Sequence, residues 1–228
     1  MSLSHPPFKN RILAALPNED LQLLLPHLQQ VELKKKQVLC DIGQTFDFVY
    51  FIEQGVTSFL TTMKDGASIE VGMIGYEGAT PLSPLFGEQS SQHHIVTQLP
   101  GRAAKIEVRH CMAAFEKSPA LRQGVLYFTN SFLNQGAQTA ACIRLHSVEQ
   151  RLARWLLMSG DRFQSATLPL TQEFLSIMLG VRRAGVSEAA SEIQRSGLIT
   201  YTHGQITICD REGLEKMACE CYGNDRKR

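Results

Sequence analysis

Hydrophobic residues recur along the chain with two kinds of spacing, one typical of helices and one typical of strands. Residues 7–28 hold two short helical patterns around a break at "LPNED", the first with Ile12, Leu13 and Leu16, the second with Leu21, Leu24, Leu25 and Leu28. From Val31 to Val108 they give way to short β-branched and aromatic runs: "FVYFI", "VTSFL", "SIEVGMI" and "HHIVTQL". Glycines punctuate these runs at Gly43, Gly55, Gly66, Gly75, Gly87 and Gly101. The pattern predicts a helical lead-in followed by an all-β sandwich or barrel.

The clearest turn in this extended region is Asp65-Gly66, which stands between "LTTMK" and "ASIEV". Aspartate followed by glycine is typical of a two-residue hairpin turn, because both central residues can adopt positive φ. We therefore expect a β-hairpin centred on these two residues.

Helical spacing returns after Val108. Ser118 followed by Pro119 is typical of a helix start, because serine caps the first turn and proline fits the first helical position. Steps of four and three residues along the long helix that follows define a seam of Leu121, Val125, Phe128, Phe132, Gln135 and Thr139, which continues to Cys142. From spacing alone, this seam either packs on the chain's own β domain or forms a homodimer interface.

A further helix is expected from Ser147 to about Asp161, with Ser147 as its cap. Its apolar face holds Val148, Leu152, Trp155 and Leu156, and the charged residues off that face are Glu149, Arg151 and Arg154. We interpret it as the first helix of a C-terminal domain.

The stretch "LTQEFLSIMLGVRRAGVSEAASEIQRSGL" predicts two helices separated by a tight turn. Thr171 can cap the first, whose apolar residues Phe174, Leu175, Met178 and Leu179 recur at helical spacing up to Gly180. The second runs to about Ser196, where Gly197 ends it. Its inward positions are Val186, Ala190 and Ile193, and its outward positions are Arg183, Ser187, Glu188 and Ser191.

A helix-turn-helix of this kind can read DNA, because the start of its second helix contacts base edges in the major groove. Arg183 is placed to pair with guanine, whereas Arg182, Thr171 and Gln172 are expected to contact the phosphate backbone. Gly185 fits a close approach of a partner helix or of DNA. Downstream, "LITYTHGQITI" predicts a hairpin wing whose tip residue His203 could touch phosphate. A small helical subdomain with solvated arginines is the alternative interpretation.

Composition narrows the class of protein. A chain of 228 residues that is 43% hydrophobic favours two modest domains, and its formal net charge of +1 gives no attractive field for nucleic acid. No apolar run approaches the roughly 18 residues of a membrane span, and the N-terminus lacks a secretory pattern, so we expect a cytoplasmic protein. The six scattered cysteines are expected to be reduced, and no metal site is predicted.

Motifs for catalysis are missing from the sequence. It has no GxSxG, Walker loop or HExxH, and the glycines of "GMIGYEG" have the wrong spacing for a dinucleotide fingerprint. We therefore expect no enzymatic activity.

Four stretches together resemble the Crp-Fnr family of bacterial transcription regulators: "GQTFDFVYFIEQGVTSFL", "SVEQRLARWLL", "LPLTQEFLSIMLGVRRAGVS" and "SGLITYTHGQITI". The resemblance covers nearly the whole chain. It implies an α+β protein with an N-terminal double-stranded β-roll, jelly-roll-like and of the cyclic-nucleotide-binding type, over residues 1–116. A long dimerisation helix over 117–145 and a C-terminal winged helix-turn-helix over 146–228 would follow.

The resemblance also implies the partners. A Crp-Fnr regulator binds a palindromic operator in double-stranded DNA as a homodimer, so the seam from Leu121 to Thr139 becomes the expected dimer interface. RNA polymerase is a further expected partner, and a membrane is not. Arg183 falls where the family's first recognition arginine lies, but Ala184 and Glu188 occupy the following glutamate and later arginine positions. The operator code of the cyclic-AMP regulator should therefore not transfer.

The sensing end departs further from the family pattern. The family's cyclic-nucleotide cassette has a Gly-Glu-Leu-type turn and an Arg-Ser/Thr-Ala run, but here Leu82 stands near the glutamate position and Gln92, His93 and His94 where the arginine belongs. Without that arginine, burial of a cyclic phosphate is costly, so cyclic AMP is not expected. An iron-sulfur cluster would need more N-terminal cysteines than Cys40, and haem has no support either.

The effector stays unknown from the sequence. Candidate pocket residues are Glu77, Leu82, His93 and His94, and the two adjacent histidines should point to opposite faces of a strand. Two alternatives stay open: a cyclic-nucleotide-responsive regulator with a divergent phosphate cassette, and a cyclic-nucleotide-responsive interaction module without DNA function.

Overall fold

The computed structural model describes residues 8–226, and the side chains up to residue 223. The first residue of the expected helical lead-in, Pro7, and the outermost ends of the expected first and last domains lie outside this range. Internal contacts group the chain into two compact units. One comprises the chain up to Phe59 together with Met73–Phe132, and the other comprises Leu60–Gly72 together with the chain from Leu133 onward. Within the described residues, no helix combines the length and apolar character needed to cross a membrane.

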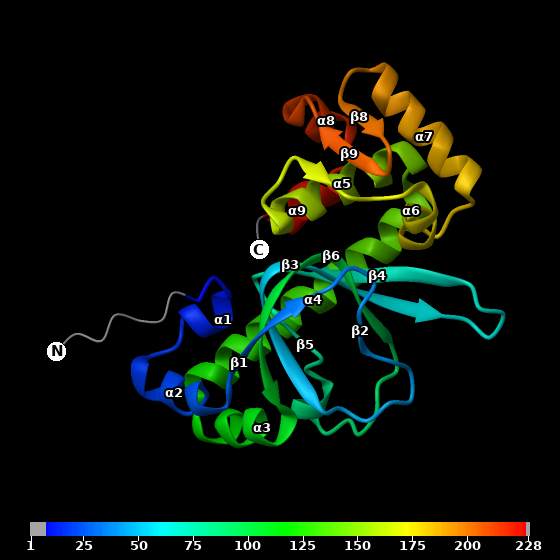
Figure 1. The fold of residues 1–228 in the computed structure, drawn as a ribbon. Helices are drawn as coiled ribbons and strands as arrows, with labels where there is room; N and C mark the ends of the chain where they lie inside the picture. The colour runs from blue at the N-terminus through cyan, green and yellow to red at the C-terminus, as the bar shows by residue number, and fades with distance from the viewer. Residues whose placement is uncertain (1–7, 227–228) are drawn as a thin grey trace. The chain divides into compact units, whose positions relative to one another are not determined.

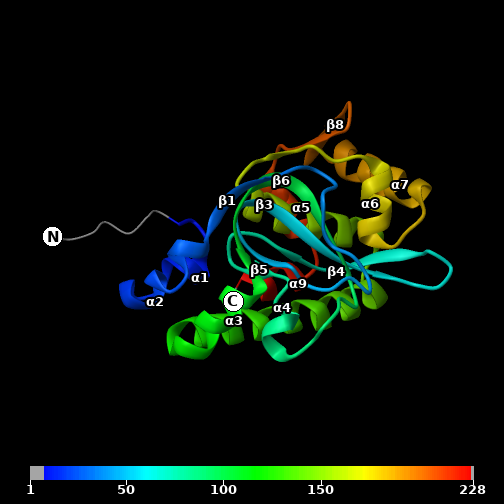
Figure 2. The same ribbon diagram turned by 60° about the horizontal axis from the view of Figure 1, so that its bottom comes forward.

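The first unit begins with short helical turns and continues into an antiparallel sheet, coloured blue to green in Figures 1 and 2. The turns are α1 (Arg11–Ala14), α2 (Asn18–Gln22) and the 3-10 turn η1 (Leu25–His27). The strands are β1 (Gln29–Leu33), β2 (Val38–Cys40), β3 (Phe48–Thr62), β4 (Ser68–Ile74), β5 (Ala79–Thr80) and β6 (His94–Glu107), with a second 3-10 turn η2 (Ser83–Phe86). The sheet order is β1-β6-β3-β4, with β2 added on β6 and β5 on β3. This confirms the expected α+β fold with an N-terminal β-domain.

Two glycines that the sequence pattern placed between strands lie inside strands instead. The runs "FVYFI" and "VTSFL" form one strand, β3, which passes through Gly55, and β6 passes through Gly101. A Cβ on Gly55 would meet the Leu99 carbonyl oxygen at 2.6 Å, and one on Gly101 would overlap the Gln54 backbone. Glycine is required here because the two backbones pass too close for any side chain, so the strands are longer than the sequence indicated.

The hairpin between β3 and β4 differs in detail from the prediction. The Gly66 N–H donates to the Met63 carbonyl at 2.9 Å, and the Met63 N–H donates to the Ala67 carbonyl at 2.8 Å. Lys64 and Asp65 are therefore the central turn residues, and of the expected pair only Gly66 has positive φ, at 86°. Gly66 therefore follows the two central residues of the turn. Its left-handed conformation lets the two strands resume pairing at Met63 and Ala67.

Two helices close the first unit. α3 (Val108–Lys117) is followed by the long α4 (Pro119–Leu145), whose first turn is capped by Ser118, with its Oγ accepting from the Leu121 N–H at 2.9 Å. In both ribbon views α4 sets out along the side of the strands (Figures 1 and 2). The expected cap and long helix are confirmed.

The seam assigned to the dimer interface is largely covered by the chain's own side chains. Leu121, Val125, Phe128 and Gln135 are buried, and Phe132 and Thr139 are half-buried. The Phe128 ring lies where a side chain on Gly78 would be, and burial of such a ring stabilises the fold by about 1.5 to 3 kcal/mol. The four buried residues pack within the chain, as the first of the two alternatives expects, whereas Phe132 and Thr139 keep part of their surface exposed.

A different stripe of α4 faces outward. Leu126 is 50% exposed and Leu133, seven residues later, is 71% exposed, with exposed Asn130 and Ala137 between and beyond them. Tyr127, beside Leu126, is 67% exposed. The spacing of four and three residues is that of a helix-pairing seam.

The second unit is a helical bundle with a small sheet. Its helices are α5 (Val148–Phe163), α6 (Gln172–Leu179), α7 (Arg183–Arg195), α8 (Arg211–Met217) and α9 (Cys221–Arg226). The strands β7 (Thr167–Leu168), β8 (Ile199–Thr202) and β9 (Gln205–Ile208) pair antiparallel in the order β7-β9-β8. The core is made of fully buried side chains: Leu152, Leu156, Leu175, Val186, Ile193 and Leu214.

Helix α5 begins as predicted but buries one of the residues expected outside. Ser147 and Gln150 form a reciprocal capping box, and Leu152, Trp155 and Leu156 are buried. Arg154 is buried as well, at 7% exposure, with Nη2 lying 3.4 Å from Thr139 Oγ1 on α4. Its long aliphatic stem lets a charged residue lie in a packed interface while the guanidinium keeps a polar partner.

The start of strand β4, which belongs to this second unit, packs against α5 and the end of α6. Trp155 Nε1 donates to Glu70 Oε1 at 2.9 Å, and a Cβ on Gly180 would overlap the Ile69 side chain. Strand β4 therefore contacts α5 through Glu70 near its start. The same strand ends in Met73 and Ile74, which are buried core residues of the first unit.

Candidate nucleic-acid interface

Helices α6 and α7 are joined by a three-residue turn, Gly180 to Arg182. Thr171 caps α6, with Oγ1 accepting from the Phe174 N–H at 3.2 Å. At the other end Gly180 has φ +61°, and the N–H groups of Gly180 and Val181 donate to the carbonyls of Ile177 and Ser176. A left-handed residue of this kind ends a helix sharply. The sequence prediction of helix, tight turn, helix is confirmed.

The beginning of α7 presents two exposed arginines. Arg182 is the N-cap residue and Arg183 the first helical residue, and no acidic residue lies in the first turn. Within the described residues neither guanidinium has an ion-pair partner. Positive side chains at the positive end of a helix dipole raise the local potential and are unfavourable for the isolated helix. The same arrangement favours an anionic partner such as DNA phosphate.

The rest of α7 separates into a packed and an exposed face. Val186, Ala189, Ala190 and Ile193 are buried, and Glu188 and Ser191 are exposed. Ser191 Oγ donates to the Ser187 carbonyl at 2.7 Å, so its hydroxyl hydrogen is directed to its own helix. Within the chain a Cβ on Gly185 would meet nothing within 4 Å, so the expected close approach of a partner helix there is wrong.

Two residues predicted to contact DNA are joined to each other. Ser187 Oγ donates to Gln172 Oε1 at 2.8 Å, and the Gln172 backbone N–H donates to the Tyr201 hydroxyl at 3.2 Å. The Tyr201 N–H in turn donates to Gln194 Oε1 at 2.7 Å. These bonds fix α6, α7 and β8 to one another. The sequence pattern missed Tyr201 and Gln194, because their role depends on strand β8 lying beside α7.

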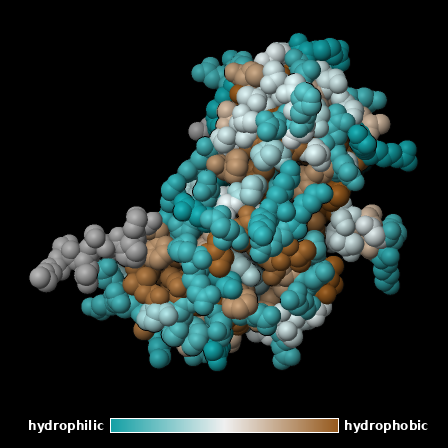
Figure 3. Space-filling model, in the orientation of Figure 1, coloured by the Kyte–Doolittle hydropathy of each residue, from teal (hydrophilic) through white to brown (hydrophobic). Residues whose placement is uncertain are grey.

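The wing is the tight hairpin between β8 and β9. His203 and Gly204 form its turn with φ of +49° and +75°, and the strands pair from Ile199↔Ile208 to Thr202↔Gln205. Positive φ at both central residues matches the twist of a two-residue hairpin. His203 is exposed at the tip, as predicted. In the view of Figure 3 the surface over α7 and the wing is mainly hydrophilic.

Comparisons with known proteins agree with this geometry. Residues 150–217, from α5 to α8, match the family model of the Crp-like helix-turn-helix domain. The chain therefore contains a Crp-like helix-turn-helix domain. Over 198 residues it is 22% identical to the transcriptional regulatory protein btr of Bordetella pertussis, covering 83% of this chain and 81% of btr.

Solved structures extend the likeness beyond the helix-turn-helix domain to most of the fold. FixK2 from Bradyrhizobium japonicum superposes with a TM-score of 0.71 at 14% identity, covering 84% of this chain and 98% of FixK2. The c-di-GMP responsive global regulator CLP of Xanthomonas campestris gives a TM-score of 0.69 at 15% identity, covering 84% of this chain and 99% of CLP. At these identities the likeness concerns the fold.

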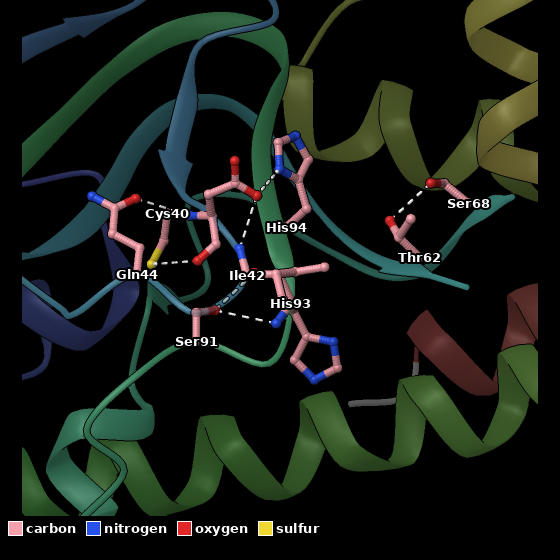
Figure 4. A network of polar contacts seen from close by, with 9 residues as sticks. Cys40, Ile42, Gln44, Thr62, Ser68, Ser91, His93 and His94 are labelled. Atoms are coloured by element: carbon pink, nitrogen blue, oxygen red, sulfur yellow. Dashed lines mark hydrogen bonds and ion pairs between the residues drawn. The ribbon is translucent and has the colours of Figure 1, made fainter. Parts of the chain in front are cut away.

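The four candidate effector residues of the β-domain do not converge on one site. Glu77 lies in the turn after β4, where its Oε1 accepts from the Gly75 N–H at 3.2 Å, and Leu82 is buried. His93 and His94 point in opposite directions, as predicted (Figure 4). The His94 Nδ1 lies 3.0 Å from Asp41 Oδ1, whereas the His93 ring packs 5.7 Å from the Phe59 ring, measured between centroids.

Asp41, the residue after β2, belongs to a small polar network that reaches His94 at the start of β6. Figure 4 shows His94 and further members of this network, Gln44, Ser91 and His93. Asp41 Oδ1 accepts from the Ile42 N–H at 2.8 Å, the Asp41 N–H donates to Gln44 Oε1 at 3.1 Å, and Ser91 Oγ accepts from the His93 N–H at 3.2 Å. The hydrogen bond with His94 lowers the pKa of the Asp41 carboxyl below its ordinary value. A carboxylate here adds negative charge beside His94, which disfavours an anionic ligand at this point.

A pocket of about 450 Å³ lies elsewhere in the first unit and contains none of these four residues. Its wall includes Lys9, Glu32, Glu53 and Arg102. Of the Glu53 carboxyl, Oε2 accepts from the Lys9 backbone N–H at 2.7 Å, whereas Oε1 is buried without a partner in the described structure. The wall therefore holds two cationic and two anionic side chains, and its charge by itself favours neither a cationic nor an anionic ligand.

Proposed function

We propose that this chain is a sequence-specific, DNA-binding transcription regulator that acts as a homodimer under the control of a signal at its β-domain. The observation that carries the proposal is the start of α7, where Arg182 and Arg183 are exposed and belong to a Crp-like helix-turn-helix domain. Among the residues that the structure describes, neither has a carboxylate partner. Arg183 would read a base edge through its guanidinium fork, and Arg182, Thr171 and Gln172 would contact phosphates. Of the other outward residues, Glu188 and Ser191 would face the groove.

A homodimer supplies the second recognition helix that a palindromic operator requires. We assign the contact to the outward stripe of α4, with Leu126, Leu133 and their neighbour Tyr127, because these large apolar side chains are exposed in the single chain. Residues 1–116 would then sense, 117–145 dimerise and 146–228 bind DNA. The expected setting is the cytoplasm, with RNA polymerase as a further partner.

Signal transfer to the DNA-binding part would run through backbone that both units share. Helix α4 continues from the first unit into the second, and β4 carries the Glu70–Trp155 hydrogen bond at its start and core residues at its end. A ligand or protein on the β-domain that alters either element would change the spacing of the two recognition helices in a dimer.

A cyclic nucleotide is the second candidate for that signal, and the likeness to CLP, which is described as c-di-GMP responsive, favours it. The carboxylate of Asp41 beside His94 disfavours it, because it lies near the position where the family binds phosphate. Thermal shift assays with cyclic AMP and c-di-GMP separate these cases. We expect no rise in Tm with cyclic AMP.

The proposal is tested by selecting genomic DNA fragments with the purified full chain at near-physiological salt and without added ligand. A two-fold-symmetric motif in the selected fragments supports a dimeric regulator that is competent without an effector. Salt-sensitive binding without any motif would show that an effector has to be present first. Absence of salt-dependent DNA binding would instead support an interaction module without DNA function.

A further inference from the structure

Four side chains with metal-ligand chemistry converge where the end of α4 meets the start of α9. They are Cys142 in the last turn of α4, His146 directly after that helix, Cys219 just before α9, and Cys221, the first residue of α9. Their ligand atoms all lie within 4.8 Å of one another. All four belong to the second unit, and the three cysteines are buried.

The distances suit a single tetrahedral ion. The Sγ atoms of Cys142 and Cys219 are 3.5 Å apart, and Cys221 Sγ lies 3.6 Å from His146 Nδ1. Zn–S bonds of about 2.3 Å and Zn–N bonds of about 2.0 Å place ligand atoms about 3.3 to 3.8 Å apart in a tetrahedron. These two pairs already match such edges, and the other ligand atoms lie within 4.8 Å of one another, so binding an ion needs only a small contraction. The group is too compact to enclose a cluster of several irons.

The imidazole of His146 is oriented as a metal ligand requires. Its Nδ1 faces Cys221, while its Nε2 lies 3.2 Å from Glu220 Oε2. Metal-bound histidines in proteins commonly donate their second ring N–H to a carboxylate, which fixes the tautomer and strengthens the ligand. The Glu220 carboxylate therefore leaves Nδ1 as the lone-pair nitrogen on the side of the thiols.

The surroundings suit thiolates rather than thiols. Gln138 Nε2 lies 3.0 Å from Cys221 Sγ and donates to it. The positive charge of Arg154 attracts a thiolate at Cys142, and that of Arg151 attracts thiolates at Cys142 and Cys219. Three thiolates and one divalent ion leave a single negative charge, which a nearby guanidinium compensates.

We propose that Cys142, His146, Cys219 and Cys221 bind one Zn²⁺ ion in a closed structural site. Soft thiolates with one imidazole favour zinc among the common divalent ions, and four protein ligands leave no open position for catalysis. The ion would join the last turns of α4, just before the α4–α5 junction at Ser147, to the chain that leads into α9. The sequence analysis missed this site because Cys142 and Cys219 are 77 residues apart.

The test begins with the metal content of the full chain, purified under reducing conditions without chelator or histidine tag. Elemental analysis should find about one zinc per chain, and an organomercurial that blocks thiols should release it. Cys142→Ser and Cys219→Ser should each lose the zinc. Cys209→Ser and Cys40→Ser, which remove cysteines outside the group, should keep it.

Cobalt substitution makes the result independent of whether a serine variant folds. The unaltered chain with Co²⁺ in place of Zn²⁺ should show the intense ligand-field bands of tetrahedral cobalt and sulfur-to-cobalt charge transfer. His146→Cys should keep the tetrahedral spectrum but move it to longer wavelength. Either a wild-type chain without metal after anaerobic loading with zinc, or iron in place of zinc, overturns the proposal. A Cys142–Cys219 disulfide in the reduced, zinc-loaded preparation does so too.

Discussion

The winged helix-turn-helix and the β-domain differ in how their candidate functional residues are assembled. In the first, Arg182, Arg183 and His203 project from a helix start and a hairpin tip, and each is exposed as the sequence indicated. In the second, His93 and His94 diverge, and Leu82 is part of the core. A helix face or a turn is fixed by neighbours a few residues away, whereas a pocket between strands depends on residues far apart in the chain.

Two stripes of the same helix show the same difference on a smaller scale. The spacing of Leu121, Val125 and Phe128 identified an apolar seam on α4 correctly, but not what covers it. Leu126 and Leu133 have the same spacing and are exposed. Periodicity predicts which residues share a face, and only the packed structure decides which face meets its own chain.

The largest expected effect concerns the outward stripe of α4. Leu133→Glu should convert the protein to monomers and weaken operator binding by about 10² to 10⁴-fold, because the second half-site then no longer binds intramolecularly. Sedimentation velocity and operator titration measure the two effects. Met63→Glu, at an exposed apolar residue of the β3–β4 turn, is the control and should stay dimeric. A Leu133→Glu protein that is still dimeric would place the interface elsewhere.

Two glycine substitutions should separate the β-domain from the recognition helix. Gly101→Ala should lower the free energy of unfolding by about 1 to 3 kcal/mol or more, because its Cβ would overlap the Gln54 backbone. Gly185→Ala should raise it by about 1 kcal/mol, because the site within α7 is open. Denaturant unfolding measures both. Equal effects of the two changes would contradict the strand packing described for Gly55 and Gly101.

The base-reading role of Arg183 predicts a loss of discrimination rather than of general affinity. Arg183→Ala should cost about 1 to 3 kcal/mol at one base pair of each half-site. Arg195→Ala is the matched control, since Arg195 lies at the far end of α7 and pairs with Glu192 at 2.7 Å. Competition binding with single-base operator variants distinguishes them. If Arg183→Ala weakens random DNA equally, the arginine contacts phosphate instead.

A smaller and sequence-independent effect is expected at the wing. His203→Ala should weaken operator and random DNA by a similar factor of less than about tenfold and reduce the salt dependence of binding, as loss of a phosphate contact does. His203→Asn preserves a residue that tolerates positive φ and serves as a control for turn geometry. Loss of specificity at a single base would show that the wing reads sequence.

The smallest effect concerns pH and the Asp41–His94 pair of the β-domain. Because the pKa of Asp41 is lowered in the folded protein, its contribution to stability is present above the ordinary aspartate pKa and is lost as pH falls through the lowered value. Since the carboxyl is exposed, the change should be slight. Asp41→Asn should abolish this part of the acid-dependent fall in Tm. An unchanged pH profile would mean that the pair contributes nothing measurable.

The sequence by itself determined the order of elements, the caps at Ser118, Ser147 and Thr171, the turn at Gly180 and the exposed arginines that follow it. Each of these depends on residues within one or two helical turns. The tertiary structure alone decided that the strands pass through Gly55 and Gly101, that Arg154 is buried and that Ser187 bonds to Gln172. It also decided that Cys142 and His146 meet Cys219 and Cys221. Contacts between distant segments are created by packing, and spacing along the chain carries no record of them.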